Sequence, residues 1–315
     1  MKVVVTGGAG FIGSNLVRHL ASRPSVVQVV ALDDLSAGQA QNLDGIERTS
    51  LVVGSILDRS TLDRTVRGAD VVVHLAARGS VPRSLTDPLR TNLVNVDGTL
   101  AVLESVRANA PQAQVIFASS SSVYGANPIM PKHEDMTVMP MSPYAVSKLA
   151  GEQYLLAYAR SFELRVLPFR LFNVYGPLQT AGHAYAAVVP AFIDAALHRR
   201  PLPIYGDGLQ TRDFTFVGTV VEVLGRCITE GLTSAGPVNL AFGTRRSLMD
   251  VVVMLEELLG ATVQRQHLPS RLSDVRDSNA DHRRLCELLP GLEAVPMELG
   301  LAHTLAWMQM VYSSG

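Results

Sequence analysis

KVVVTGGAGFIGS, residues 2–14, places a short apolar run directly before three spaced glycines. The run favours a buried strand, and a helical pattern follows over residues 12–22. Gly7 permits a tight turn, Gly10 lets the backbone approach a pyrophosphate, and Gly13 allows close packing of helix on strand. Free N–H groups at the helix start would bind the phosphates. The stretch therefore predicts the first unit of a dinucleotide-binding sheet.

An acidic residue follows at the spacing that this unit requires. Asp33 lies 20 residues beyond Gly13, at the end of the second predicted strand. Its carboxylate is suited to accept hydrogen bonds from ribose hydroxyls and disfavours a 2′-phosphate, so NAD is favoured over NADP. The neighbouring Asp34 either shares this role or is a solvated turn residue.

Strand and helix patterns alternate through the first half of the chain. The strands are continuously apolar, as in a parallel sheet covered on both faces. They are predicted at Lys2–Thr6, Val26–Leu32, Ser50–Val53, Val71–Leu75, Gln114–Ala118 and Leu164–Phe169. Helices are predicted between them at Ile12–Ser22, Asp58–Val66, Leu89–Asn109 and Pro143–Ser161. This order predicts an α/β fold with a Rossmann-like, doubly wound parallel sheet.

The regular alternation of strand and helix patterns ends at about residue 175. Helices are predicted at Ala186–His198, Gly218–Glu230, Leu248–Leu259 and Asp281–Leu289, and short strands at Leu202–Tyr205, Pro237–Leu240 and Thr262–Gln266. We therefore expect a cofactor-binding domain with the catalytic residues over residues 1–175. A smaller α/β lobe that binds most of the substrate is expected over 176–315, with an interleaved boundary.

Composition narrows the function classes. The chain has 315 residues, is 47% hydrophobic and carries a net charge of −1 without a basic stripe, so we expect no nucleic-acid partner. Cys227 and Cys286 lack the spacing of a disulfide framework or zinc site, and no metal is expected. No apolar run approaches the length of a membrane span, and the N-terminal run is too short for a signal peptide. A cytoplasmic protein without a membrane partner is the expectation.

A tyrosine and a lysine four residues apart form the predicted chemical centre. Pro143 suits the first turn of a helix, which puts Tyr144 and Lys148 on one face. Tyrosine needs a nearby cation to act as a base near neutral pH, and Lys148 with a positive nicotinamide would supply one. A surface helix with a chance Tyr and Lys is the plain alternative.

Four serines end the preceding predicted strand, in ASSSSVYG at 118–125. Ligands of open α/β sheets bind at the carboxyl ends of the strands. Hydroxyls there can hold a substrate oxygen and share its proton with Tyr144. A plain polar loop is the alternative interpretation of the same residues.

Taken together, these motifs resemble the extended short-chain dehydrogenase/reductase superfamily, in its UDP-glucose 4-epimerase branch. The resemblance extends over essentially the whole chain. It rests on GGAGFIGS (7–14), VVHLAA (72–77), ASSSSVYG (118–125), SPYAVSK (142–148), FRLFNVYGP (169–177), IYGDGLQTRDF (204–214) and DVRDSNAD (274–281). It implies an NAD-dependent enzyme that acts on a UDP-sugar, with a homodimer formed through the helices near 89–109 and 143–161.

The resemblance also implies roles for individual residues. The catalytic residues would be Ser120, Tyr144 as the base, and Lys148, which grips the nicotinamide ribose. Cofactor contacts are implied for Gly7, Gly10, Phe11, Ile12, Gly13, Asp33, Asp34, Ser36, Gly38, Ser55, Ile56, Leu75, Ala76, Ala77, Asn95, Ser119, Tyr144 and Lys148. Substrate contacts are implied for Ser120, Ser121, Ser122, Tyr144, Asn173, Val188, Tyr205, Arg212, Arg271 and Asp274.

The implied reaction is epimerisation at C4 of the sugar. Tyr144 would take the proton of the 4-hydroxyl while hydride passes from C4 to NAD. The 4-keto sugar would then rotate in the pocket. Hydride would return to its other face, and Tyr144 would return the proton. NAD would stay bound and be regenerated in each cycle. Dehydratases and decarboxylases of nucleotide sugars carry an acid in the segment that is Ser121-Ser122 here, so epimerisation fits better. Two functions of other classes also stay open, a net oxidoreductase and a non-catalytic NAD-sensing module.

Three sugars stay open. The segment 118–127 resembles UDP-glucuronate 4-epimerases, in which hydroxyls would bind the C6 carboxylate, and this favours UDP-glucuronate slightly. Ser278 leaves room for an N-acetyl group, and residues 184–190 resemble UDP-N-acetylhexosamine epimerases. UDP-glucose is the third candidate.

Three departures from the family pattern accompany the resemblance. Ser55 replaces an acid near the adenine and Leu171 an aromatic residue near the nicotinamide, while Gly218-Thr219 replaces an acidic pair before a helix.

Overall fold

The computed structural model describes residues 1–181, 187–269 and 276–313. The chain forms two compact units, each assembled from separate segments. The first contains Met1–Asn127, Thr137–Leu171 and Val221–Asn239, and the second contains Pro128–Met136, Phe172–Val220 and Leu240–Gly315. The chain thus crosses between the units several times.

A seven-stranded sheet forms the centre of the first unit, in the order β11-β6-β5-β4-β1-β2-β3. Its strands are β1 (Lys2–Thr6), β2 (Gln28–Asp33), β3 (Thr49–Val53), β4 (Val71–His74), β5 (Gln114–Ser120), β6 (Arg165–Leu171) and β11 (Val238–Leu240). Strands β1 to β6 pair in parallel. The predicted doubly wound α/β fold is confirmed. The strand order reverses direction between β1 and β4, which is where such sheets bind ligands.

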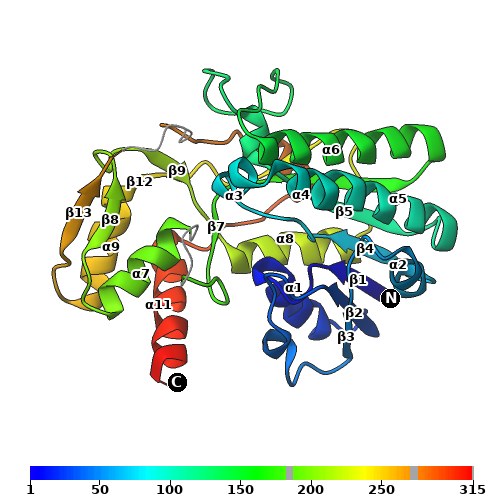
Figure 1. Cartoon of the computed structure of the whole chain (residues 1–315), viewed down its shortest axis with the longest axis horizontal. Helices are drawn as coiled ribbons and strands as arrows, with labels where there is room; N and C mark the ends of the chain where they lie inside the picture. The colour runs from blue at the N-terminus through cyan, green and yellow to red at the C-terminus, as the bar shows by residue number, and fades with distance from the viewer. Residues whose placement is uncertain (182–186, 270–275, 314–315) are drawn as a thin grey trace. The chain divides into compact units, whose positions relative to one another are not determined.

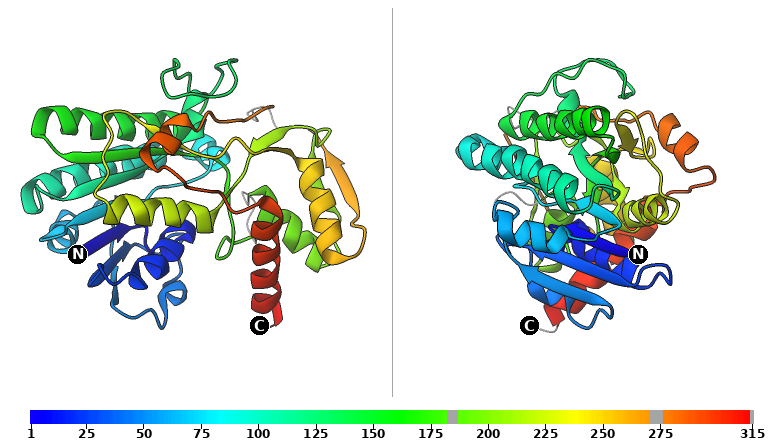
Figure 2. Two further views of the ribbon diagram at one scale, coloured as in Figure 1. Left: turned by 180° about the vertical axis from the view of Figure 1, so that it is seen from behind. Right: turned by 90° about the vertical axis from the view of Figure 1, so that its right-hand side faces the viewer.

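Helices cover both faces of this sheet (Figures 1 and 2). On one face, α2, α5 and α6 pack over a core of Val, Leu and Ile side chains from the strands. Helices α1 and α8 lie on the other face (Figure 1). The bounds are α1 (Phe11–Ala21), α2 (Arg59–Val66), α5 (Gly98–Asn109), α6 (Pro143–Phe162) and α8 (Val217–Thr229).

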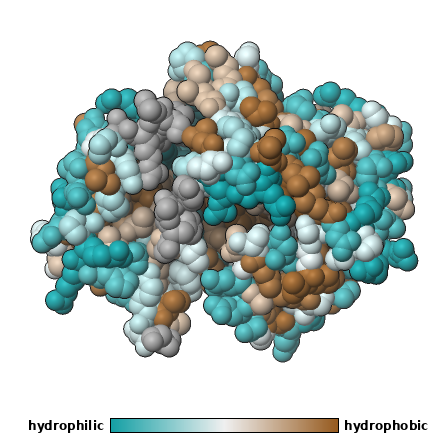
Figure 3. All heavy atoms as spheres, in the orientation of Figure 1, coloured by the Kyte–Doolittle hydropathy of each residue, from teal (hydrophilic) through white to brown (hydrophobic). Residues whose placement is uncertain are grey.

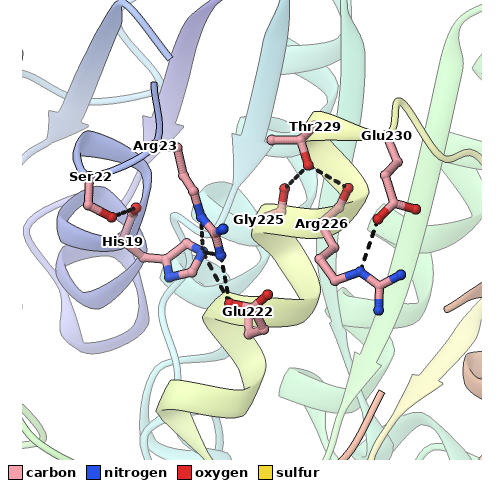
Figure 4. Close-up of polar contacts among 8 residues, drawn as sticks. All are labelled: His19, Ser22, Arg23, Glu222, Gly225, Arg226, Thr229 and Glu230. Carbon is pink, nitrogen blue, oxygen red and sulfur yellow. Dashed lines mark hydrogen bonds and ion pairs between the residues drawn. The ribbon is translucent and has the colours of Figure 1, made fainter. Parts of the chain in front are cut away.

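Helix α1 follows the glycine turn and is braced by α8. A Cβ atom on Gly225 would lie 2.4 Å from Nε2 of His19, so glycine lets α8 approach α1 closely. Beside this contact, Arg23 donates to a carboxylate oxygen of Glu222 at 2.7 Å and also contacts His19 (Figure 4). Desolvation lowers the pKa of His19, and Arg23 lowers it further. The brace thus combines one ion pair with a largely neutral imidazole.

The long helix predicted at 89–109 is interrupted in the structure. Helix α4 (Pro88–Asn92) runs into a π-helical turn (Leu93–Asp97), and α5 continues to Asn109. A separate short helix, α3 (Val81–Thr86), was not predicted. Ser80 begins α3 and Asp87 begins α4, each through a side chain that accepts a backbone N–H three residues later. Two caps and two prolines in nine residues therefore separate α3 from α4, ahead of the predicted helix, whereas within that helix only the hydrogen-bonding pattern changes, at the π-helical turn.

Short elements make up the second unit. It contains α7 (Val188–Leu197), α9 (Leu248–Leu259), α10 (Arg283–Leu288) and α11 (Met297–Ser313). Three strand pairs accompany them: β7 (Val174–Tyr175) with β10 (Thr215–Phe216), β9 (Thr211–Asp213) with β12 (Arg245–Ser247), and β8 (Leu202–Tyr205) with β13 (Arg265–Leu268). Helix α11 and the two-residue strands were not predicted. Across the described residues, no helix has both the length and the apolar character needed to cross a membrane.

A buried ion pair joins α6 to β6. Glu152 is fully buried on α6 and accepts from Arg170 on β6 at 2.7 and 3.0 Å. Its carboxylate also accepts the hydroxyl of Ser119, on β5, at 2.7 Å. The guanidinium of Arg170 lies 4.7 Å from the ring centroid of Tyr124. These groups tie two strands and a helix together where β5 ends.

This network predicts an unequal response to two substitutions. Glu152→Ala leaves Arg170 buried without its counter-ion, so we expect it to lower the free energy of unfolding by about 3–5 kcal/mol. Glu230→Ala removes an exposed partner of Arg226 (Figure 4) and should cost less than about 1 kcal/mol. Urea unfolding of the two variants measures both values. Equal losses would show that the buried pair does not hold the sheet.

Candidate functional site

The turn after β1 has the close backbone approaches that its glycines were predicted to allow. Gly7 has φ +71°, and a Cβ atom there would lie 2.8 Å from the backbone nitrogen of Ala76. A Cβ atom on Gly13 would lie 2.0 Å from the carbonyl oxygen of Gly7. Gly10 precedes α1 in an extended conformation without a side-chain cap. Phe11 and Ile12 form the first turn of α1 and are half-buried.

Asp33 ends β2 beside this turn and is buried. Its carboxylate accepts the backbone N–H of Ala9 and that of Leu35, each at 2.9 Å. Desolvation raises the pKa of Asp33, and the backbone hydrogen bonds oppose that shift. A Cβ atom on Gly38 would meet both the carboxylate and the backbone of Ala9. Besides the predicted ribose contact, Asp33 therefore fixes the glycine turn itself.

Asp34 faces a different partner. One of its oxygens accepts both the N–H and the hydroxyl of Ser36, at 3.0 and 2.5 Å. Its side chain is exposed. These local hydrogen bonds shape the loop after β2. They are the contacts expected of a solvated turn residue, which was the second of the two predicted roles of Asp34.

The end of β4 lies against the glycine turn. Leu75 donates its N–H to the carbonyl of Thr6 at 3.1 Å, and Ala76 and Ala77 continue the loop. Asn95 is buried beneath that loop: it accepts the N–H of Arg78 at 2.7 Å and donates to Ser147 on α6 at 2.9 Å. Asn95 thus braces the loop against α6. Its predicted contact with the cofactor stays a prediction.

His74 was missed by the sequence analysis. It is buried at the end of β4, with one ring nitrogen 2.7 Å from the hydroxyl of Thr6 and the other 3.0 Å from that of Thr99. Burial and the charge of Lys148 lower the pKa of His74 to about 3, so it is neutral. A neutral imidazole between two hydroxyls links β1, β4 and α5 without adding charge near the site. The only sign of His74 in the sequence was its place in the VVHLAA motif, residues 72–77.

Two predicted adenine-side residues lie after β3. The hydroxyl of Ser55 accepts the N–H of Leu57 at 3.2 Å. The side chain of Ile56 is buried, and a Cβ atom on Gly98 would lie 2.5 Å from it. Ile56 is therefore part of the core against α5.

Tyr144 and Lys148 lie on the first turns of α6, which begins with Pro143 and is capped by Ser142. Lys148 is buried, and its ammonium donates to the carbonyl of Ala118 at 2.8 Å. It also lies 5.3 Å from the ring centroid of Phe117. Burial lowers the pKa of Lys148 to about 8. A contact with β5 therefore fixes the cation beside the end of that strand.

The structure brings Ser120 and Tyr144 together. Burial raises the pKa of the Tyr144 phenol, and a hydrogen bond with the Ser120 hydroxyl lowers it. Ser120 also accepts the backbone N–H of Ser122 at 3.2 Å and its hydroxyl at 2.9 Å. The neighbouring Ser119 instead points into the buried network with Glu152. Ser119 thus bonds to a buried carboxylate, whereas Ser120 contacts Ser122.

The predicted substrate residues of the second unit lie on several of its elements. Asn173 follows β6 with φ +25° and donates to the carbonyl of Asp213 at 3.2 Å. Arg212, on β9, donates to two backbone carbonyls, of Thr211 and Arg276. Tyr205 ends β8, and the half-buried Val188 begins α7. The predicted Arg271 and Asp274 lie outside the described residues.

Asp213 is a further buried carboxylate of the second unit that the sequence analysis did not select. It accepts the N–H groups of Gly243 and Ala280, both at 3.0 Å. Burial raises its pKa, and the hydrogen bonds oppose that shift. It fixes two loops around β9, the strand that carries Arg212.

The departure before α8 has a packing explanation. A Cβ atom on Gly218 would lie 2.5 Å from the ring of Phe216. Thr219 is buried, and its hydroxyl accepts the N–H of Val295 at 3.1 Å. The pair therefore forms a stable helix start without acidic residues. Leu171 ends β6 opposite Ser120 in the sheet register and is half-buried.

The first unit fits a dinucleotide. Cβ atoms at Gly7 and Gly13 would fill the turn, and the uncapped N–H groups of α1 are the donors that a pyrophosphate requires. Asp33 lies one strand away, in reach of the same turn through Ala9. Tyr144, Lys148 and Ser120 lie at the end of β5 in the same unit.

Comparisons with known proteins agree with this arrangement. The model of the NAD dependent epimerase/dehydratase family matches residues 3–241. The UDP-glucose 4-epimerase of Mycolicibacterium smegmatis is 38% identical to the chain, over 98% of this chain and 99% of that protein.

Solved structures are similar over the same extent. The UDP-N-acetylglucosamine 4-epimerase of Methanobrevibacter ruminantium, in complex with UDP-N-acetylmuramic acid, has a TM-score of 0.92 at 34% identity, covering 98% of both chains. The UDP-glucuronic acid 4-epimerase of Bacillus cereus, in complex with UDP-glucuronic acid and NAD, has a TM-score of 0.90 at 29% identity, covering 99% of this chain and 100% of that one.

The predicted resemblance and the predicted cofactor, NAD, are confirmed by these matches. The chain belongs to the NAD-dependent epimerase/dehydratase family, within the short-chain dehydrogenase/reductase superfamily.

Proposed function

We propose that the protein interconverts the C4 epimers of a UDP-hexose through a transient 4-keto sugar. The observation that carries this proposal is the cluster at the end of β5. Ser120 ends that strand, Tyr144 and Lys148 lie one turn apart at the start of α6, and the buried Lys148 ammonium donates to the carbonyl of Ala118 on β5. The adjoining residues, Ser121 and Ser122, are neutral. Removing a proton from C5, or eliminating water across C5 and C6, requires an acid or base there. Their neutrality therefore favours epimerisation over dehydration or decarboxylation.

Each residue of the cluster has a defined part in this reaction. Tyr144 takes the proton of the sugar 4-hydroxyl and later returns it. Ser120 donates a hydrogen bond to the phenolate or to the oxygen on C4. Lys148 holds a positive charge near the phenolate, which favours the ionised form. NAD supplies the hydride acceptor and donor at C4. Because the reaction has no net redox change, we propose that the cofactor stays bound through each cycle.

We propose that the cofactor and the substrate are bound mainly by different parts of the chain. We assign NAD to residues 1–175, through the glycine turn, Asp33 and the ends of β1 to β5. We assign most of the UDP-sugar contacts to residues 176–315, in which Arg212 and Arg271 suit a diphosphate because a guanidinium can engage two oxygens at once.

UDP-glucuronate is the first of three substrates in this proposal. Hydroxyls at Ser121 and Ser122 offer donors to its C6 carboxylate. UDP-glucose and UDP-N-acetylglucosamine follow, because 4-epimerases of both are among the similar proteins. Ser278, half-buried in the second unit, leaves space for an N-acetyl group.

The decisive experiment supplies each sugar separately to the purified protein and follows the products by NMR. We expect the C4 epimer of at least one sugar, with no accumulation of NADH. Tyr144→Phe removes the proton acceptor but keeps the ring, so it should retain NAD and lose at least about 100-fold in turnover.

Other products would contradict the proposal. A 4-keto-6-deoxy sugar would identify a dehydratase, and a pentose would identify a decarboxylase. Stoichiometric NADH would indicate a net oxidoreductase. Absence of turnover with all three sugars, or near-normal turnover in Tyr144→Phe, would remove the proposed mechanism.

We also propose that the protein forms a homodimer through the helical stretch from α4 to α5, residues 88–109, and α6. These helices contact each other within the first unit. Their outer faces carry exposed apolar side chains, with Leu89 at 83%, Val146 at 52% and Phe162 at 48% exposure. Apolar side chains are visible over α4 in Figure 3. Apolar area of this kind favours association.

Light scattering tests this proposal. We expect a dimeric mass for the wild-type protein and a shift toward monomer for Leu89→Glu, because an interface would desolvate the new carboxylate. Val253→Glu is the matched control, since Val253 is 48% exposed on α9 in the other unit and should leave the mass unchanged. A monomeric wild-type protein at high concentration would contradict the proposal.

A further inference from the structure

The contacts around Ser120 limit where its proton can point. A serine hydroxyl has one donor proton and two acceptor lone pairs. One acceptor site takes the backbone N–H of Ser122 at 3.2 Å, and the Ser122 hydroxyl lies 2.9 Å from the same oxygen, within donor reach of the other site. When the Ser122 hydroxyl donates, both acceptor sites are filled by one residue, and Ser120 has only its proton left to share.

We propose that Ser122 is a positioning residue which makes Ser120 an obligatory hydrogen-bond donor toward Tyr144 and the oxygen on C4. This inference rests on the proposed epimerase function only where it concerns the oxygen on C4 of the sugar. The effect of Ser122 on Ser120 and Tyr144 does not depend on the substrate. The proposed arrangement uses the single hydroxyl proton of Ser122 within the protein, so Ser122 would contact a substrate only as an acceptor, and the donor to a C6 carboxylate would be Ser121.

The direction of this hydrogen bond matters for the chemistry. A Ser120 that donates stabilises the phenolate of Tyr144, whereas a Ser120 that accepts would stabilise the neutral phenol. The hydrogen bond from Ser120 lowers the pKa of Tyr144, against burial, which raises it. Ser122 therefore favours the form of Tyr144 that can take a proton.

Local geometry makes Ser122 well placed for this task. Ser120 caps the 3₁₀ turn Ser121–Tyr124, and the turn places both donors of Ser122 over the Ser120 oxygen. The turn is fixed from behind by the buried Tyr124, whose hydroxyl donates to Asn239 at 2.6 Å. Ser122 is thus held by backbone geometry, and its hydroxyl is the part that a substitution can remove.

Other ionisable groups of the first unit lie near the end of β5 on three elements. Helix α6 contributes Lys148 and Glu152, β6 contributes Arg170, and β4 contributes the neutral His74. All four are unchanged in variants of Ser122. A difference in titration between such variants and the wild type therefore reports on Ser120 and Tyr144.

The test compares Ser122→Ala with Ser122→Thr. Alanine frees one acceptor site of Ser120, which can then accept from the Tyr144 phenol. We expect the pKa of Tyr144 to rise by about 0.5–1 unit, the equivalent of one neutral hydrogen bond of about 1 kcal/mol. Threonine keeps the hydroxyl and should restore the wild-type value. Ser121→Ala, one residue away, is the matched control and should leave this pKa unmoved.

Two measurements report the pKa. The first is the pH dependence of kcat/KM with whichever UDP-sugar the protein converts. The second is a tyrosinate absorbance titration of the NAD-loaded protein, corrected by subtracting that of Tyr144→Phe. The titration needs no turnover, so it decides the role of Ser122 even if every UDP-sugar fails as a substrate.

The outcomes separate clearly. An unchanged pKa in Ser122→Ala overturns the proposal, as does an equal rise in Ser122→Thr, which would indicate a general disturbance of the turn. If Ser122→Ala does not fold, Ser122→Cys replaces it, since a thiol is a weak donor of similar shape. The same upward shift is expected there, and a wild-type value would overturn the proposal.

Discussion

The buried contact between Glu152 and Arg170 is the constraint on which the chemical centre depends. It joins α6 to β6, and the Ser119 hydroxyl brings β5 into the same network. Ser120 follows Ser119 directly, and Lys148 lies one helical turn before Glu152. One fully buried carboxylate therefore joins the helix that carries Tyr144 to the strand that carries Ser120. Buried ion pairs add little stability relative to apolar packing, so its value here is in positioning.

Much of the fold was predictable because its signals are local. The glycine turn, the six apolar runs and the helix with Tyr144 and Lys148 each occupy a short stretch, and all of these elements appear where they were predicted. The doubly wound sheet followed from the same alternation, because parallel strands joined by helices form such a sheet. The helix predicted over residues 89–109 shows what a local pattern leaves out. Its apolar periodicity predicted the extent of the helix, but it does not distinguish the π-helical turn at Leu93–Asp97 from the α-helical turns on either side.

The remaining features of the site depend on contacts between distant residues. His74 was not selected, since its two hydroxyl partners, Thr6 and Thr99, are far away in sequence. Asn95 and Ser119 were predicted to contact the cofactor, yet their polar atoms are engaged within the protein. Asp33 was predicted to contact the ribose of the cofactor, and its carboxylate also holds the glycine turn through the N–H of Ala9. A motif identifies which residue types a site requires, but the fold decides which of their atoms face a ligand.

Burial acts on the two titrating residues of the centre in opposite directions. It raises the pKa of Tyr144 and lowers that of Lys148 to about 8, so desolvation favours the uncharged form of both. A phenol in such a site becomes a base only when favourable interactions with its charged form exceed the cost of desolvation. Ser120 contributes one hydrogen bond, and Lys148 is fixed on the carbonyl of Ala118. In the proposed mechanism, the positive charge of the oxidised cofactor would supply the rest, which would couple proton removal by Tyr144 to the presence of a hydride acceptor.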